Sequence, residues 1–293
     1  RSWQETDSRL SSASMSEDRE PLQFQPLTGG LDVGFLAELG HRKLNEFGLR
    51  DDAVEIRGSF SCAGQHNLAS PLCVSADGFA ALDAPGVPPT HCAVPGTLLN
   101  ANTLDDFKER DKAALLQGVA RAIWDDVASG AALAQPERLL RFLLLTFADL
   151  KTHKYYYWFA FPAFAMAPPT LASPPTPLAQ QADPMALHAL RTAYGAMPRG
   201  ENGCVPAFFA VRRPGGGGGW EVGPLARWAE WRAAAAEDDE VWLAFADPCP
   251  LLTNPGWPLR NLLLLAAHLL RGGEGGEGGG EGDGGGGGGG GGG

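Results

Sequence analysis

The segment Leu139–Ala163 constrains the fold of this chain most, because large apolar side chains dominate it. Leucine and phenylalanine recur at helical spacing in its first part, and Pro136 and Glu137 suit the first turn of a helix. We therefore predict a helix over 136–150. Residues 155–161 are almost entirely aromatic, which favours a buried strand. Arg141 and a polar break keep the apolar run below the roughly 20 residues of a membrane span.

The rest of the chain alternates between helical spacing and short apolar runs. Asp32 is a predicted helix cap, Gly48 a predicted helix end, and Thr103 with Asp106 resembles a capping box. Further helices are predicted at 112–129, from Asp183, around 225–232 and at 258–270, and strands at 54–56, 205–211 and 240–246. This mixture predicts an α+β fold, with helices packed on a mixed sheet and strand 240–246 internal to that sheet.

Glycine, proline and charge divide the chain into regions. Residues 1–20 and the Gly-rich tail 272–293 are expected to be disordered, and 21–271 to form one domain with a Pro-rich loop at 167–184. Irregular strands and loops are expected over 61–96. Because the chain begins with Arg1 and ends in ten glycines, we expect an incomplete gene model or a fragment.

Charge and cysteine content exclude several classes of function. The net charge is −11 and there is no basic run, so nucleic acid is not an expected partner. The five cysteines are widely spaced and form no C-x-x-C pair, so the sequence supports neither a zinc site nor a redox motif. No secretory signal peptide is visible, and a reducing, cytoplasmic setting is expected.

Residues that could carry chemistry are few. Cys249 lies between two prolines after a predicted strand, so a cysteine hydrolase using it with one of the histidines is one hypothesis. His153 and His268 are each interpreted as a surface or satisfied core histidine rather than a ligand. A structural cysteine is favoured, because no activating neighbour is visible in sequence. The adjacent carboxylates Asp105–Asp106 and Asp125–Asp126 diverge on a helix and are interpreted as solvated faces. We expect no catalytic, cofactor-binding or metal-binding residue in this chain.

Blocks of sequence carry more information than these motifs. They are Leu31–Phe35 with Arg42–Glu46, Gly96–Phe107, Leu143–Lys151 with Tyr156–Trp158, and Asp247–Cys249 with Pro255–His268. In this order they resemble the N-terminal domain of the autophagy-related protein seven family, the ubiquitin-like-modifier-activating enzymes of autophagy. The resemblance covers roughly residues 21–268.

This resemblance implies a recruitment domain. In the family it recruits the E2-like conjugating enzymes, while a following domain holds ATP and Mg, the homodimer surface and the catalytic cysteine. That domain is not matched here, so the chain is expected to be non-catalytic and to meet ubiquitin-like modifiers only through the missing domain. A cytoplasmic location is implied, with the preautophagosomal structure as a further candidate site. A stand-alone interaction module from a truncated transcript is the alternative.

The family also carries a Phe-Ala-Pro motif linked to conjugation. Here it reads Phe24-Gln25-Pro26, and Gln25 is the departure from the pattern. By resemblance, Phe24, Gln25 and Pro26 are a candidate partner motif. The other interpretation is that Phe24 and Pro26 pin the N-terminal segment to the core.

Overall fold

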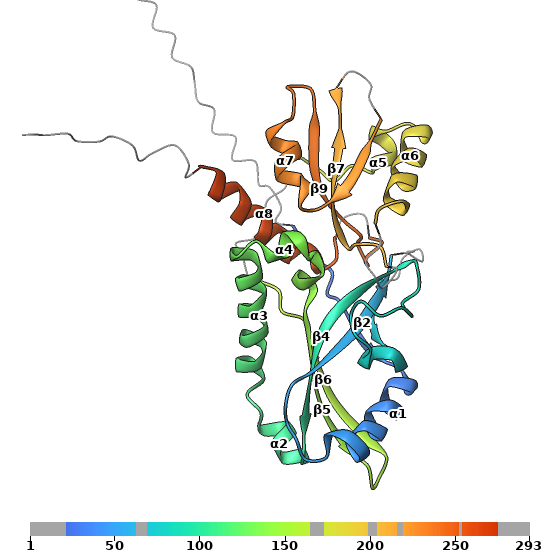
Figure 1. Ribbon diagram of the computed structural model, residues 1–293, viewed down its shortest axis with the longest axis vertical. Coiled ribbons are helices and arrows are strands. Elements are labelled where there is room, and N and C mark those ends of the chain that lie inside the picture. The colour runs from blue at the N-terminus through green and yellow to red at the C-terminus, as the bar shows by residue number, and fades with distance from the viewer. Residues whose placement is uncertain are drawn as a thin grey trace, which may run out of the picture.

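The computed structural model describes residues 22–62, 69–164, 173–198, 204–215, 219–251 and 254–274, and it has an α+β fold with two sheets (Figure 1). The segment expected to be disordered at 1–20, residues 275–293 of the Gly-rich tail and residues 167–172 of the Pro-rich loop lie outside this described part. Residues 272–274, expected to belong to the disordered tail, instead form the end of helix α8 (Pro258–Glu274). Within the described ranges, no helix combines the length and hydropathy that a membrane span requires.

The larger sheet has six strands in the order β1-β3-β2-β4-β5-β6. Their bounds are β1 Gly29–Leu31, β2 Val54–Ser61, β3 Leu72–Val74, β4 His91–Ala101, β5 Phe142–Asp149 and β6 Lys154–Ala160. Strands β2 and β4 pair antiparallel, β4 and β5 pair parallel, and β5 and β6 form an antiparallel hairpin. Residues 142–146 of β5 are all buried, so both faces of the sheet are covered there.

Helices lie on both sides of this sheet, with α1 on one side and α3 on the other (Figure 1). Before β4 come α1 Val33–Arg42, the π-helical turn η1 Lys43–Phe47 and the 3₁₀ turn η2 Ala76–Phe79. Between β4 and β5 come α2 Leu104–Glu109, α3 Lys112–Ala128, α4 Ala131–Ala134 and the 3₁₀ turn η3 Pro136–Leu140. Phe35 and Leu39 of α1 and Ile123 and Val127 of α3 are buried in one continuous core.

Short polar side chains begin these helices as their positions in the sequence predict. Asp32 accepts a hydrogen bond from the backbone N–H of Phe35 at 2.6 Å, and Thr103 accepts from Asp106 at 3.0 Å. Asp183 accepts from the backbone N–H of Ala186 at the start of α6. Gly48 follows η1 with a φ of 57°, a left-handed conformation that costs glycine little. These predicted caps are confirmed.

A second, three-stranded sheet lies at one end of the molecule (Figure 1). Its order is β8-β7-β9, with β7 Phe208–Arg213, β8 Glu221–Pro224 and β9 Glu240–Phe245. It is accompanied by α5 Leu178–Gln181, α6 Pro184–Gly195 and α7 Arg227–Ala233, and the described chain ends in α8 Pro258–Glu274. Trp228 and Trp231 of α7 pack with Ala210 of β7 as a separate small core.

The predicted helix over 136–150 is wrong. Its first residues form η3 (Pro136–Leu140), and the leucine-rich part is strand β5 (Phe142–Asp149). β5 lies inside the sheet between β4 and β6, is parallel to β4, and is covered on both faces over residues 142–146. Such strands are apolar throughout and resemble a buried helix in sequence. Leu143 is buried as a core residue, whereas Phe147 is only half-buried.

Two other predictions about strands need correction. Strand β9 lies at the edge of the small sheet rather than inside the large one, and its Trp242 is half-buried and stacks on Trp220. The region 61–96, expected to be irregular, contains the start of β4, a regular strand of 11 residues in the centre of the large sheet. Within the predicted Pro-rich loop, 178–181 form the short helix α5.

Candidate functional site

The Phe24-Gln25-Pro26 segment lies against the loop that leads into α8. The backbone N–H of Gln25 donates to the carbonyl of Pro255 at 2.8 Å, and the N–H of Trp257 donates to the carbonyl of Gln25 at 3.0 Å. Gln25 and Gly256 thereby form a parallel bridge. The two sequence blocks at opposite ends of the domain are therefore joined through backbone hydrogen bonds.

The side chains of this segment differ in exposure. Phe24 is half-buried, and the guanidinium carbon of Arg260 lies 5.5 Å from the centroid of its ring, a cation–π contact. Gln25 is also half-buried, whereas Pro26 is exposed. The segment is thus held by its backbone and by Phe24, while Pro26 remains available at the surface.

Asp247 holds the loop before α8 in shape. Its carboxylate accepts hydrogen bonds from the backbone N–H groups of Cys249 at 2.8 Å and Gly256 at 3.0 Å. Burial raises the pKa of Asp247, and these hydrogen bonds offset only part of that rise. A Cβ on Gly256 would lie 2.4 Å from an oxygen of Asp247, so this close approach requires glycine.

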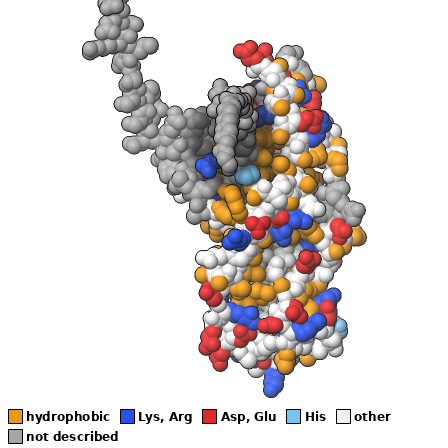
Figure 2. All heavy atoms as spheres, turned by 60° about the vertical axis from the view of Figure 1, so that its left-hand side comes forward, with side chains coloured by type: hydrophobic (Ala, Val, Ile, Leu, Met, Phe, Trp, Pro, Cys, Tyr) orange, Lys and Arg blue, Asp and Glu red, His pale blue; other side chains and the backbone are white. Residues whose placement is uncertain are grey.

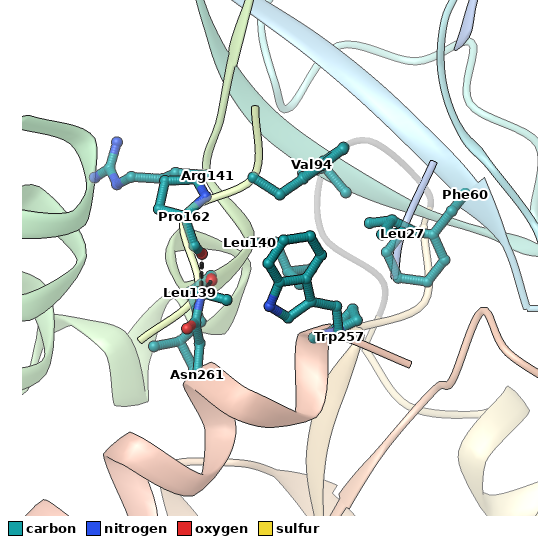
Figure 3. Close-up of a pocket in the computed structure, with 12 residues that line it drawn as sticks. Leu27, Phe60, Val94, Leu139, Leu140, Arg141, Pro162, Trp257 and Asn261 are labelled. Atoms are coloured by element: carbon teal, nitrogen blue, oxygen red, sulfur yellow. Dashed lines mark hydrogen bonds between the residues drawn. The ribbon is translucent and has the colours of Figure 1, made fainter. Parts of the chain in front are cut away.

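Asn261 links α8 to η3 and to the segment that follows β6 (Figure 3). Its side-chain amide donates to the carbonyls of Leu139 at 2.8 Å and Pro162 at 3.0 Å. Its side-chain oxygen accepts from the backbone N–H of Phe164 at 3.3 Å. A single buried side chain therefore pairs three backbone groups that no regular sheet or helix satisfies.

A small apolar cavity lies beside this junction, with the side chains of Trp257 and Leu140 directed toward it (Figure 3). Its volume is about 20 Å³, which is room for one water-sized molecule and far too little for a cofactor or a substrate. The indole N–H of Trp257 is buried and has no hydrogen-bond partner among the described residues. The junction is therefore built for packing rather than for holding a small molecule.

A larger, open groove of about 770 Å³ runs between β2, β4 and η3. Its polar lining includes Glu55, Thr97, Glu137, Arg138 and Arg141. Burial raises the pKa of Glu137, and the two neighbouring arginines lower it less. The groove thus presents both signs of charge, and Figure 2 likewise shows acidic and basic side chains interspersed on one face of the molecule.

Asp126 anchors the two arginines of this groove. Its carboxylate accepts from Arg138 at 2.8 Å and from Arg141 at 2.8 Å, and it is buried. The interpretation of Asp125–Asp126 as a solvated face is therefore wrong for Asp126, although Asp125 is exposed. Sequence reasoning missed the contact because Arg138 and Arg141 belong to a predicted helix that does not form.

Over the residues that it describes, the structure does not place a histidine in the hydrogen-bond contact with Cys249 that the hydrolase hypothesis requires. Cys249 is buried, and its thiol donates to the carbonyl of Asn254 at 3.2 Å. His153 lies in the turn between β5 and β6, and His268 packs edge-on against Trp124. In the described part of the chain, no hydrogen bond links Cys249 to a histidine, and no group of three or more potential ligands is placed to bind a metal.

Solved structures share this fold. The N-terminal domain of Atg7 from Kluyveromyces marxianus matches with a TM-score of 0.57 and 19% identity, covering 85% of this chain and 81% of that chain. The Kluyveromyces marxianus Atg7NTD–Atg10 complex matches with a TM-score of 0.56 and 18% identity, covering 85% and 78%. The fold is thus similar to that of the Atg7 N-terminal domain.

The family follows from the sequence comparison. The chain belongs to the family described as "Ubiquitin-like modifier-activating enzyme ATG7 N-terminus", which matches residues 22–273. It is 38% identical to the ubiquitin-like modifier-activating enzyme ATG7 of Mus musculus over 249 residues and 36% identical to that of Homo sapiens over 253 residues. Each match covers 84% of this chain but only 35% and 34% of the relative, about a third of its length.

Proposed function

We propose that this chain is the part of an E1-like autophagy enzyme that recruits the E2-like conjugating enzyme. In this role the chain supplies a docking surface and leaves the activation of ubiquitin-like modifiers to the remainder of the enzyme. The site of action is the cytoplasm, with the preautophagosomal structure as a candidate location.

The observation that carries the proposal is the match to a family defined by its N-terminal domain. The support from structure is that a protein of the same fold forms a complex with Atg10 in the Kluyveromyces marxianus structure. The cavity at the junction has a volume of about 20 Å³, which is too small for a substrate.

The proposal includes Phe24, Gln25 and Pro26 as a partner motif. Pro26 is exposed directly beside a segment whose backbone is held in place, so a partner could contact it without first ordering this part of the chain. Phe24 carries part of the pinning role, because its ring packs under Arg260. A contact role and a pinning role therefore fall on different residues of the motif and can be tested separately.

One variant and its matched control test the contact role of Pro26, by size-exclusion chromatography with a purified autophagy conjugating enzyme. Pro26→Ala should weaken co-elution and leave the melting temperature unchanged, because Pro26 is exposed. Pro175→Ala is the matched control, since Pro175 is also exposed but belongs to the loop before α5. Equal co-elution of both variants would remove Pro26 from the contact, and a fall in melting temperature for Pro26→Ala would assign it to pinning instead.

A further inference from the structure

Two cysteines meet where β2 and β4 come together. Cys62 directly follows β2, and its backbone N–H donates to the carbonyl of Thr90 at 2.8 Å, which extends the pairing with β4. Phe60 lies opposite Cys92 in this register. Because alternate residues of a strand point to the same face, Cys62 lies on the same face as Cys92. Their sulfur atoms are 3.0 Å apart.

The two thiols have different environments. Cys92 is fully buried with 0% of its surface exposed, whereas Cys62 is half-buried. The pKa of the Cys62 thiol is lowered, chiefly because its thiolate accepts a hydrogen bond from Cys92. The pKa of Cys92 is raised well above its ordinary value because it donates that bond and because it is buried. A half-buried thiol with a lowered pKa and a fully buried thiol are therefore in contact.

We propose that Cys62 and Cys92 are an oxidation site that forms a reversible intramolecular disulfide when the protein meets hydrogen peroxide. The sulfur atoms must approach from 3.0 Å to a bond length of about 2.05 Å, a movement of about 1 Å. Cys73, which is exposed on β3, has no such partner thiol among the contacts described for it. The proximity of a second thiol distinguishes the pair from an ordinary surface cysteine.

The chemistry balances with peroxide as the oxidant. The Cys62 thiolate attacks one oxygen of hydrogen peroxide, the O–O bond breaks, and a sulfenic acid and hydroxide form. The sulfur of Cys92 then attacks the sulfenic sulfur, the S–O bond breaks, and hydroxide leaves and takes the proton of Cys92 as water. Two thiols and one peroxide thus become one disulfide and two waters, with two electrons passing from sulfur to oxygen. A thiol reductant restores both cysteines by exchange.

The cross-link would act on the strands that surround the junction. It would close a loop that contains β3 and η2, which restricts the unfolded chain and stabilises the folded one. It would also fix β2 to β4 beside Phe60 and Val94, both of which line the cavity at Trp257. Oxidation should therefore raise the melting temperature of the chain, and dithiothreitol should return it to the starting value.

Mass spectrometry after peroxide treatment tests the pairing. The chain is oxidised, blocked with N-ethylmaleimide and cut before aspartate, which separates Cys62 in fragment 52–76 from Cys92 in fragment 83–104. Because fragment 52–76 also holds Cys73, the Cys73→Ser protein is used as the background. The expected product is fragment 52–76 linked to fragment 83–104 by a disulfide that dithiothreitol reduces. The product should be absent from the protein that carries Cys62→Ser as well as Cys73→Ser.

Three results would overturn the proposal. One is a link from fragment 83–104 to fragment 183–237, because the buried Cys204 also lies close enough to Cys92 to affect its pKa. Another is a sulfinic acid at Cys62 without any link. The third is two unmodified thiols after peroxide has already oxidised the exposed Cys73 of the parent protein. A thermal melt of each reduced variant establishes that the protein tested is folded.

Discussion

The side-chain amide of Asn261 donates a hydrogen bond to the carbonyl of Leu139 across 122 positions of sequence, at 2.8 Å. The same amide reaches the carbonyl of Pro162, so α8 is tied to the turn that precedes β5 and to the segment that follows β6. The segment with Phe24 meets the same junction through Trp257. The start of α8 therefore determines how the N-terminal segment is presented.

Asn261→Ala should destabilise the protein strongly. The change leaves two buried carbonyls without partners, at about 1–3 kcal/mol for each unpaired group, so the free energy of unfolding should fall by ~2 kcal/mol or more. Asn45→Ala is the matched control, since Asn45 is exposed and bonds only within its own helical segment; its effect should stay within about 0.5 kcal/mol. Urea denaturation measures both, and equal midpoints would contradict the role given to Asn261.

Two glycine substitutions should have opposite effects. A Cβ on Gly96 of β4 would lie 2.1 Å from the ring of Phe142, so Gly96→Ala should force the packed strands apart and lower the melting temperature. Gly118 is exposed on α3 with nothing within 4 Å of its added Cβ, so Gly118→Ala should stabilise by about 0.8–1 kcal/mol through helix propensity. Thermal melts of the two variants that shift in the same direction would contradict this packing.

The Asp126 contact should make stability depend on pH. Burial alone would raise the pKa of Asp126, but the hydrogen bonds from Arg141 and Arg138 outweigh it, so the pKa is lowered on folding. A lowered carboxyl pKa contributes stability above the unfolded value of about 3.9, and that stability is lost as the pH falls below it.

Asp126→Asn measures this contribution. At pH 6 the free energy of unfolding of the variant should be roughly 1–2 kcal/mol lower than that of the parent. This loss is smaller than that expected for a fully buried ion pair, because the side chains of Arg138 and Arg141 are 37% and 30% exposed. The difference in free energy of unfolding between the variant and the parent should be smaller at pH 3, because the parent then loses the stability that the Asp126 carboxylate contributes. Asp125→Asn, which alters an exposed carboxylate, should match the parent at both values. A difference between Asp126→Asn and the parent that is constant with pH would show that the ion pair is not the cause.

The sequence predicted elements whose signals are local. Asp32, Thr103 and Asp183 cap helices because a short polar side chain pairs with a backbone N–H three residues later. The aromatic run at 155–161 was correctly expected to be extended, because it pairs with β5. Periodicity failed for Leu139–Ala148, since a strand covered on both faces shows no alternation of polar and apolar residues.

The candidate site was predicted only in part. The resemblance located Phe24, Gln25 and Pro26, but their pairing with Pro255 and Trp257 depends on tertiary contacts over more than 200 positions. Asp126 was missed for a similar reason, because its partners lie in a turn that sequence reasoning assigned to a helix. The contact between Cys62 and Cys92 likewise depends on the register of β2 and β4, which spacing along the chain does not reveal.

This chain alone should not activate a modifier. Activation requires a nucleotide site for the acyl-adenylate and a nucleophilic thiol to capture it. The thiol of Cys249 is buried and bonded to the carbonyl of Asn254. Incubation with ATP, magnesium and a purified autophagy modifier, followed by a non-reducing gel, should give no thiol-sensitive adduct. Such an adduct would assign activation to this chain, and the Cys249→Ser variant would then identify or exclude that cysteine.

Binding of the conjugating enzyme is the central claim, and isothermal titration calorimetry measures it most directly. A purified autophagy conjugating enzyme is titrated into the chain after a thermal melt has established that the chain is folded. We expect a saturable one-to-one isotherm with a Kd on the order of micromolar, because a partner segment that orders on binding loses conformational entropy. Dilution heats only, with a folded chain at concentrations of about 100 μM, would contradict the recruitment function.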